Sequence, residues 1–393
     1  MTIHTRTPTG DLSARMRRVA DIAAAHADSV DREGRFPQEA VDALRAERLM
    51  GIQIPAELGG ESASTAEIAE LCSILGRACS ASAMIFAMHQ IKASSLVTHG
   101  GEAPWHQAFM ARVAGEQLLL GSATTEGGIG GNLRNSICAI AVDGDTCRLE
   151  KNATVISYGD QSDAILITSR SHADAAPSDQ VMTVFLKDQY TLEKTHTWDA
   201  LGMRGTCSDG YVFKGEAPAE QILPRPFAEI AAQSMLAHAH ILWSAVWYGI
   251  AADAFAKAQA FVRAAARKSP EAAPPGAIRV AEASSLLQGV KASIVAALEA
   301  YEQAKTDDDK LSSMSFAVAM NNLKIASSQT ILTIINHCML ICGILAYKNG
   351  TPFSLGRHLR DAHSAQLMIS NDRILGNTST MLLIHKQDTS LLS

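Results

Sequence analysis

The stretch LLLGSATTEGGIGGN (residues 118–132) marks the place where the patterning of the chain changes. Before it, from residue 12 to about 118, apolar residues recur at the spacing of helices. After it, as far as about 228, apolar and polar residues alternate in short runs such as CAIAVDGDTCRLE (138–150), a pattern typical of strands. Helical spacing returns from 229 to the end. This order predicts a mainly α protein with a central β domain.

Three domains are expected from this order. They are an N-terminal helical domain over 1–118, a barrel-like β domain over 119–228 and a C-terminal four-helix bundle over 229–393. Asp143 and Gly144 separate two strand-like runs and predict a hairpin. Turn-rich stretches divide the last domain into four long helices, which we expect at 229–267, 275–304, 311–346 and 356–385.

Composition argues against several classes of protein. A net charge of −6 does not favour a nucleic-acid partner. The polar N-terminal stretch lacks the apolar core of a secretory signal, and the apolar stretch 325–347 contains polar residues typical of a buried bundle helix. We therefore expect a cytoplasmic protein that does not enter a membrane. The seven cysteines have no neighbouring set of histidines, which predicts reduced thiols and no metal site.

Five stretches, in order along the chain, resemble motifs of the acyl-CoA dehydrogenase superfamily. IPAELGGESAS (54–64) resembles a Pro-x-x-x-Gly-Gly turn, and 118–132 resembles the first strand, with Thr-Glu ahead of a glycine-rich turn. ATVISYGDQSDAILITSR (153–170) resembles the segment that passes the flavin. WDALGMRGTCSDGYVF (198–213) carries Gly-Met-Arg and Thr-x-Ser, and LGRHLRDAHSA (355–365) carries an Arg-Asp pair ahead of the last helix. The resemblance covers nearly the whole chain and implies the fold of that family.

The resemblance also implies a flavin between the β domain and the bundle. A flavin ring needs a flat apolar slot and hydrogen-bond donors at its polar edges. Thr125 and Ser157 would face these edges, and the glycine-rich turn would let a ligand approach the backbone closely. The residues that the resemblance assigns to the cofactor are Ala123, Thr124, Thr125, Gly130, Gly131, Ile156, Ser157, Arg267, Ser269, Gly343, Asn377 and Thr378.

The family cofactor is usually FAD, and FMN is the alternative. In relatives, an Arg-Lys-x-Phe-type segment and a Gly-Gly turn of a neighbouring subunit hold the adenosine half of FAD. Here Pro270 stands where the aromatic is expected, and Cys342-Gly343 replaces the Gly-Gly turn, which weakens FAD against FMN. Because adjacent subunits complete the site in relatives, a homotetramer or homodimer is expected.

The carboxylate that removes the α-proton in a dehydrogenase is missing from both of its usual places. In most relatives a Glu lies near the last helix, and its place falls here on Gly376. Other relatives carry the Glu early in the first bundle helix, where this chain has Ala239 and His240. The reaction needs such a base because the α-carbon of a thioester is a weak acid.

Three explanations remain open. A relocated base at Asp372, His89 or His240 would preserve oxidation of an acyl thioester, on CoA or a carrier protein, with an electron-transfer protein as partner. The second explanation is a flavin monooxygenase, which takes reduced flavin from a separate reductase, acts on an aromatic or similar small substrate, and needs no carbon-acid base. His89 and His363 would suit that chemistry. The third is a non-catalytic binding subunit. The acyl-thioester dehydrogenase is the leading expectation.

Overall fold

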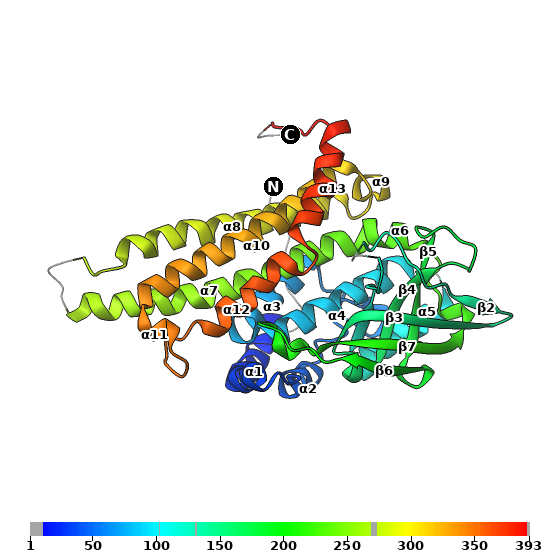
Figure 1. Ribbon diagram of the computed structural model, residues 1–393, viewed down its shortest axis with the longest axis horizontal. Coiled ribbons are helices and arrows are strands. Elements are labelled where there is room, and N and C mark those ends of the chain that lie inside the picture. Colours follow the sequence, from blue (N-terminus) through cyan, green and yellow to red (C-terminus); the bar gives the residue numbers. More distant parts are fainter. Residues whose placement is uncertain (1–10, 102, 130–131, 269–272, 391–393) are drawn as a thin grey trace.

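The computed structural model describes residues 11–101, 103–129, 132–268 and 273–390. A strand-rich part lies at one end of the molecule, and a long helical bundle extends away from it (Figure 1). Asp11 accepts a hydrogen bond from the amide of Ala14 and so begins the first helix. The N-terminal helices are α1 (Leu12–Glu33), α2 (Gln38–Ala46), η1 (Ala56–Leu58), α3 (Thr65–Ala78), α4 (Ser80–His99) and α5 (Pro104–Glu116).

Two small sheets form the middle of the chain. One has the order β1-β4-β5, with β1 parallel to β4, and the other has the order β2-β3-β7-β6 and is antiparallel throughout. Asp143 pairs with Thr146 across Gly144, which has a φ of 57°, so the predicted hairpin is confirmed. The strands are β1 (Leu120–Ala123), β2 (Ala141–Asp143), β3 (Thr146–Ser157), β4 (Ala164–Arg170), β5 (Gln180–Leu186), β6 (Tyr190–His196) and β7 (Ser208–Pro218).

The two sheets share one core, to which each contributes buried residues. Ile165 and Phe185 come from the first sheet, and Leu149 and Phe213 come from the second. Short 3-10 turns follow β3, β5, β6 and β7. These turns are η2 (Gly159–Gln161), η3 (Lys187–Gln189), η4 (Arg204–Thr206) and η5 (Ala219–Gln221).

Long helices form the C-terminal part. After α6 (Phe227–Ile230), five residues adopt a π-helix, η6 (Ala231–Met235), before α7 begins. α7 (Leu236–Lys268), α8 (Ala277–Ala304) and α10 (Met314–Cys342) pack side by side and extend away from the strands (Figure 1). The remaining helices are α9 (Asp308–Leu311), α11 (Ile344–Tyr347), α12 (Gly356–Leu367) and α13 (Asn371–Ile384).

The fourth long helix, expected to run unbroken over 356–385, is two helices, so that expectation is wrong. Ile369 lies between them with a φ of 49°, which ends the helical path. Buried Lys324 of α10 donates to the Ile369 carbonyl and to Asn371 Oδ1, both at 2.6 Å. The break is therefore held by a side chain that lies about 45 residues earlier in the sequence, which no local pattern reveals.

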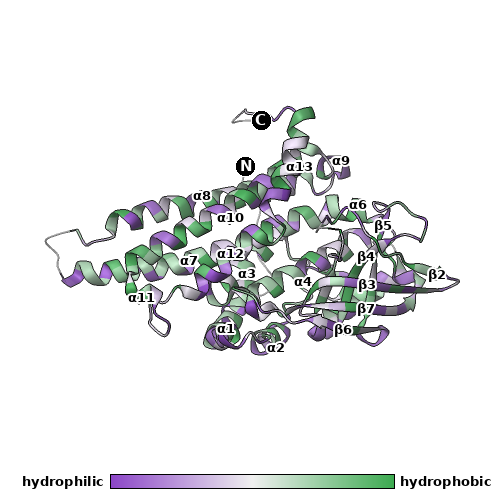
Figure 2. Ribbon diagram, in the orientation of Figure 1, coloured by the Kyte–Doolittle hydropathy of each residue, from purple (hydrophilic) through white to green (hydrophobic). Residues whose placement is uncertain are grey.

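Helix α4 lies at the centre of the molecule. It contacts α3 and α7 on one side and β1 and η4 on another, and almost all of its residues are buried. Hydropathy colouring agrees with this position, because apolar residues gather where the helices face one another (Figure 2). α4 therefore connects the β domain with the bundle.

α10 is long and apolar enough to cross a membrane by length and composition alone. It packs against α7, α8, α12 and α13, and Ile331, Ile334 and Ile335 are fully buried in this packing. Core helices of soluble proteins pass the same test. All seven cysteines are free thiols.

Candidate active site

The C-terminal ends of β1 and β3 meet where the two sheets approach each other. Thr125 Oγ1 donates to the Val155 carbonyl at 3.2 Å, and the Gly127 amide donates to the Asn152 carbonyl at 3.0 Å. Ala123 and Ile156 are buried, whereas Thr124, Thr125 and Ser157 are half-buried. The structure thus brings together the β-domain residues that the sequence assigned to the cofactor. Gly130 and Gly131 lie outside the described residues.

Three hydroxyl groups form a chain beside Thr125. Ser157 and Ser208 face each other across the β3–β7 pair, with 2.8 Å between their Oγ atoms. Ser208 Oγ lies 2.8 Å from Thr206 Oγ1, and Thr206 donates to the Met203 carbonyl. Ser208 and Thr206 were not assigned to the site from the sequence. The Thr-x-Ser pattern at 206–208 is the sequence feature that could have identified them.

The loop that carries Thr206 is fixed to the bundle. Met203 has a φ of 50°, and its amide donates to buried Asp361 of α12 at 2.7 Å. A Cβ on Gly202 would lie 2.2 Å from the Arg360 carbonyl, so only glycine permits this approach of loop and helix. Arg360 in turn pairs with Asp31 of α1. The bundle therefore sets the position of the hydroxyl chain.

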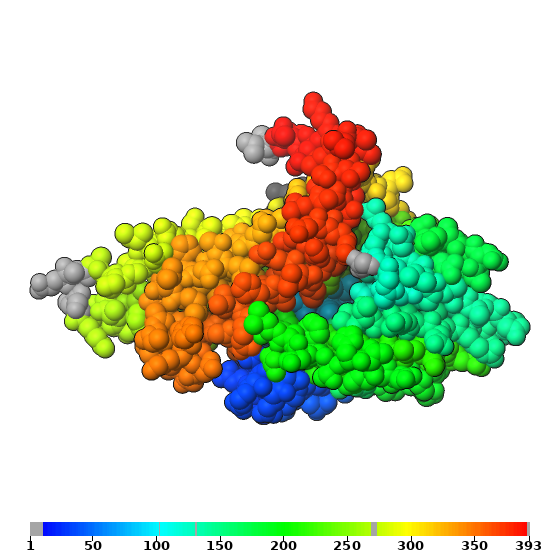
Figure 3. All heavy atoms as spheres, in the orientation of Figure 1, coloured from blue at the N-terminus to red at the C-terminus, as the bar shows by residue number. Residues whose placement is uncertain are grey.

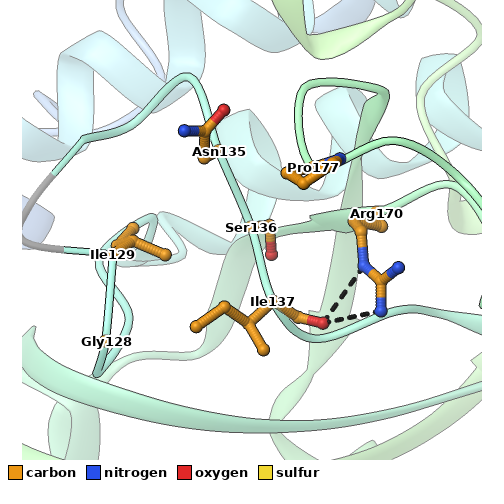
Figure 4. A pocket seen from close by; sticks show the side chains of 7 residues that line it. All are labelled: Gly128, Ile129, Asn135, Ser136, Ile137, Arg170 and Pro177. Carbon is orange, nitrogen blue, oxygen red and sulfur yellow. Dashed lines mark hydrogen bonds between the residues drawn. The ribbon is translucent and has the colours of Figure 1, made fainter.

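Buried Glu126 holds the far side of the glycine-rich turn. Its carboxylate accepts hydrogen bonds from Ser136 Oγ (2.8 Å), the Ile137 amide (3.0 Å) and the Cys138 amide (2.7 Å). Burial would raise the pKa of Glu126, but these hydrogen bonds and nearby Lys151 outweigh it, and the pKa lies below its ordinary value. A pocket of about 410 Å³ is lined by Gly128 and Ile129 of this turn together with residues that include Ile137 and Arg170 (Figure 4).

Replacing Glu126 with glutamine is expected to lower the free energy of unfolding by about 1–3 kcal/mol near neutral pH, because the amide group cannot accept all three bonds. Since the pKa of Glu126 is lowered in the folded chain, its contribution is present above the ordinary pKa and is lost as pH falls through the folded value. Urea denaturation at several pH values measures both effects. Glu116→Gln, an exposed partner of Arg112, is the matched control, and an equal loss in both variants would contradict the role of Glu126.

His89 links three parts of the fold. Its Nδ1 accepts the Leu120 amide at 3.1 Å, so the other nitrogen carries the proton and donates to the Met50 carbonyl at 2.8 Å. Burial lowers the pKa of His89 to about 4. Both ring nitrogens are therefore occupied, and the ring is neutral at physiological pH.

The other candidate bases lie on helices of the bundle. His240 is buried, with Nδ1 3.0 Å from the Met320 carbonyl of α10, and burial lowers its pKa to about 4. Asp372 and His363 are exposed on α13 and α12. Gly376, the expected place of the family carboxylate, is exposed within α13 and would have no atom within 4 Å of an added Cβ.

Three carboxylates are buried among the described residues: Glu126, Asp209 and Asp361. Glu126 accepts the three bonds given above. Asp209 accepts the Trp198 amide at 2.6 Å and pairs with Lys194, also at 2.6 Å. Asp361 accepts the Met203 amide. In the described part of the chain, each buried carboxylate thus already accepts at least one hydrogen bond from the protein.

The remaining residues assigned to the cofactor lie elsewhere. Arg267 is exposed near the end of α7, and Gly343 ends α10 at the same end of the bundle, roughly 45 Å from the start of α7 by helix length. Asn377 is exposed on α13, whereas Thr378 is buried and accepts a hydrogen bond from Asn321. Ser269 lies outside the described residues. Within one chain, these groups do not join the strand-end cluster.

Figure 3 shows a recess between α12 and α13 (red), the segment around η4 (green) and the segment after β1 (teal), with atoms in the light blue of α4 at its floor. Half-buried hydroxyl groups beside buried apolar residues, such as Thr125 and Ser157 beside Ala123 and Ile156, suit a flat ring with polar edges. The residues present therefore fit a flavin ring.

Two family models match the chain. The model of the acyl-CoA dehydrogenase N-terminal domain matches residues 11–117, and that of the acyl-CoA dehydrogenase C-terminal domain matches residues 241–373. Cyclohex-1-ene-1-carbonyl-CoA dehydrogenase of Geobacter metallireducens is 26% identical over 213 residues, which cover 52% of this chain and 55% of that protein. The match therefore spans only about half the length of that relative.

Two further comparisons cover much more of the chain. The amino sugar nitrososynthase DnmZ of Streptomyces peucetius is 24% identical over 354 residues, 86% of this chain and 84% of that protein. The FMN-bound structure of TdsC from a Paenibacillus species, a protein described as a dibenzothiophene monooxygenase, has a TM-score of 0.83 at 17% identity. That alignment covers 97% of this chain and 100% of the other, and it shows a shared fold.

Proposed function

Because the chain belongs to the acyl-CoA dehydrogenase superfamily, we propose that it is a flavin-dependent monooxygenase that receives reduced flavin from a separate reductase and oxidises a small organic molecule. Membership of the family makes the chain a flavoprotein of the acyl-CoA dehydrogenase fold. The family cofactor is FAD, and the neighbouring structures of TdsC and KijD3 contain FMN. Family membership alone does not specify the reaction, and the monooxygenase activity is our proposal.

The lack of a carboxylate at the two places where relatives carry the base supports this proposal. Among the described residues, every buried carboxylate already accepts hydrogen bonds from the protein, and Gly376 and Ala239 occupy the two places where relatives carry the base. Abstraction of an α-proton requires a positioned base of tuned pKa. Activation of oxygen by reduced flavin has no such requirement.

The residues at the strand ends would bind and orient the ring. Bound flavin supplies the electrons that activate oxygen. Thr125 and Ser157 offer hydroxyl groups to its polar edge, and the chain through Ser208 and Thr206 keeps Ser157 in place. His89 ties α4 to β1 and so fixes the floor of the recess against the strands.

Some relatives that span most of the chain support this proposal, whereas others, such as FadE25 of Mycobacterium bovis over 89% of the chain, are named probable acyl-CoA dehydrogenases. DnmZ is named a nitrososynthase, and TdsC is described as a dibenzothiophene monooxygenase. A dehydrogenase is the second candidate, because other relatives, including that of Geobacter metallireducens, are named acyl-CoA dehydrogenases. For that reaction, the relocated base would be Asp372.

We further propose that the chain assembles as a homotetramer or homodimer in the cytoplasm. Large apolar side chains are exposed on α10, α11 and α13, among them Leu340, Tyr347 and Leu383. Arg267 and Gly343 lie far from the strand ends within one chain, so a dinucleotide flavin would need a second subunit to reach both groups of residues.

One experiment with two arms tests the reaction. Protein loaded with oxidised flavin is mixed with straight and branched acyl-CoAs without oxygen, and the visible flavin band is recorded. Protein is then supplied with NADH, a flavin reductase and oxygen, and substrate oxidation is followed by mass spectrometry. We expect no bleaching in the first arm and oxygen-dependent product formation in the second.

Asp372→Asn separates the two candidate reactions. In a monooxygenase the variant should keep its activity, because that reaction needs no carbon-acid base and the carboxylate is exposed. Bleaching by an acyl-CoA in the parent protein that is lost in Asp372→Asn would overturn the monooxygenase proposal and support the dehydrogenase.

A further inference from the structure

Lys92 of α4 is a buried cation without a charged partner. Its side chain is 3% exposed, and its hydrogen-bond partner among the described residues is Met235 Sδ, 3.7 Å from Nζ. No described carboxylate lies within 4.0 Å of Nζ. An ammonium group has three donors, and a thioether is a weak acceptor. The donors of Lys92 therefore remain largely unmatched by the protein.

Two half-buried methionines lie beside Lys92. Met88 lies one helical turn before it and is the only residue of α4 between residues 80 and 96 that is not fully buried. Met235 is half-buried and ends the π-helix Ala231–Met235, a rare conformation that is frequent at functional sites. Two flexible thioether side chains thus flank the amine and could adapt to an apolar body.

The electrostatics favour an incoming anion. Burial lowers the pKa of Lys92 to about 7, and no charged neighbour contributes to the shift. The histidines of the adjoining helices, His89 and His99 on α4 and His238 on α7, have pKa values lowered to about 4 and are neutral at physiological pH. An anion beside Lys92 would supply the missing counter-charge and accept its hydrogen bonds.

We propose that Lys92 binds the carboxylate of the substrate, so that the flavin site acts on a small organic acid with an apolar body. This inference rests on the proposed function, because it names the substrate class of the same recess. The carboxylate would pair with Nζ, and the apolar body would lie against Met88 and Met235 near the strand ends.

Matched pairs of probes test the inference without turnover. Benzoate with benzamide, 3-phenylpropanoate with 3-phenylpropanamide, and hexanoate with hexanamide are titrated into protein that carries oxidised flavin. Binding is measured by calorimetry and by the change in the flavin spectrum. In the parent protein near pH 6, we expect the acid of at least one pair to bind about tenfold to a hundredfold more tightly than its amide.

Lys92→Met should abolish this preference while leaving flavin and amide binding unchanged, and Lys92→Arg should keep part of it. Above about pH 7 the bound acid must restore the proton on Lys92, so acid binding by the parent protein should weaken up to about tenfold per pH unit. Lys291→Met, an exposed change on α8, is the control and should keep the full preference.

Three results would overturn the inference: no pair shows the preference in the parent protein, Lys92→Met retains it, or Lys92→Met loses flavin binding instead. The last result would assign the lysine to the cofactor. Failure of the monooxygenase proposal is distinguishable, because it would appear as missing oxygen-dependent product while the preference for acids, measured with oxidised flavin, persists.

Discussion

Lys92→Met is expected to raise the free energy of unfolding by on the order of 4 kcal/mol below pH 7, with the gain disappearing as the pH approaches 10.5. Methionine matches lysine in helix propensity and approximate length, and it carries no charge to be buried. Below pH 7, both the folded and unfolded chains hold the proton, and the folded chain bears the whole cost of the buried charge.

The stability difference between Lys92→Met and the parent protein should become smaller as the pH rises. Between about pH 7 and 10.5, the unfolded chain still holds the proton that the folded chain has released, so the stability of the parent protein rises with pH. Chemical denaturation of both proteins across this range measures the difference. Lys291→Met should change stability by less than about 0.5 kcal/mol. A variant less stable than the parent, or a difference that does not change with pH, would refute the unpaired buried charge.

Asp361→Ala is expected to lower the free energy of unfolding by about 2–4 kcal/mol and to weaken flavin binding by about tenfold or more. The buried carboxylate accepts the Met203 amide at 2.7 Å, and its loss leaves that amide without a partner. The loop from Met203 to Ser208 would then lose its attachment to α12, and the hydroxyl chain would lose its fixed position.

Asp361→Asn separates the positioning role from the charge. Burial raises the pKa of Asp361, so an uncharged acceptor is tolerated at this place. The asparagine variant keeps an oxygen for the Met203 amide and should retain most of the flavin affinity, measured by quenching of flavin fluorescence. Unchanged flavin affinity in a folded Asp361→Ala would show that α12 does not position the site.

Features set by local pattern were predictable from the sequence. The hairpin at Gly144 follows from an Asp-Gly pair between alternating runs. Thr125 and Ser157 follow strand-like runs, and the structure brings the two strand ends together. Strand β6 is harder to identify from the sequence, because its alternation is limited to the first four residues and the remaining residues are exposed and polar.

Features set by distant partners were not predictable. Lys324 holds the break between α12 and α13, and no pattern in the neighbouring sequence reveals it. The same is true of His89, whose two ring nitrogens form hydrogen bonds with Met50 and Leu120. Lys92 stands in a long apolar stretch, where the sequence alone does not distinguish a buried amine from one that reaches solvent. Its burial against Met235 depends on the π-helix 143 residues later.

The central claim is that the strand ends and the bundle hold a flavin ring in the recess above α4. A crystal structure of the protein with bound flavin tests it most directly. We predict the ring in that recess, with its polar edge about 3 Å from the hydroxyl groups of Thr125 and Ser157. A ring bound elsewhere, or a recess closed by the protein's own side chains, would contradict the claim.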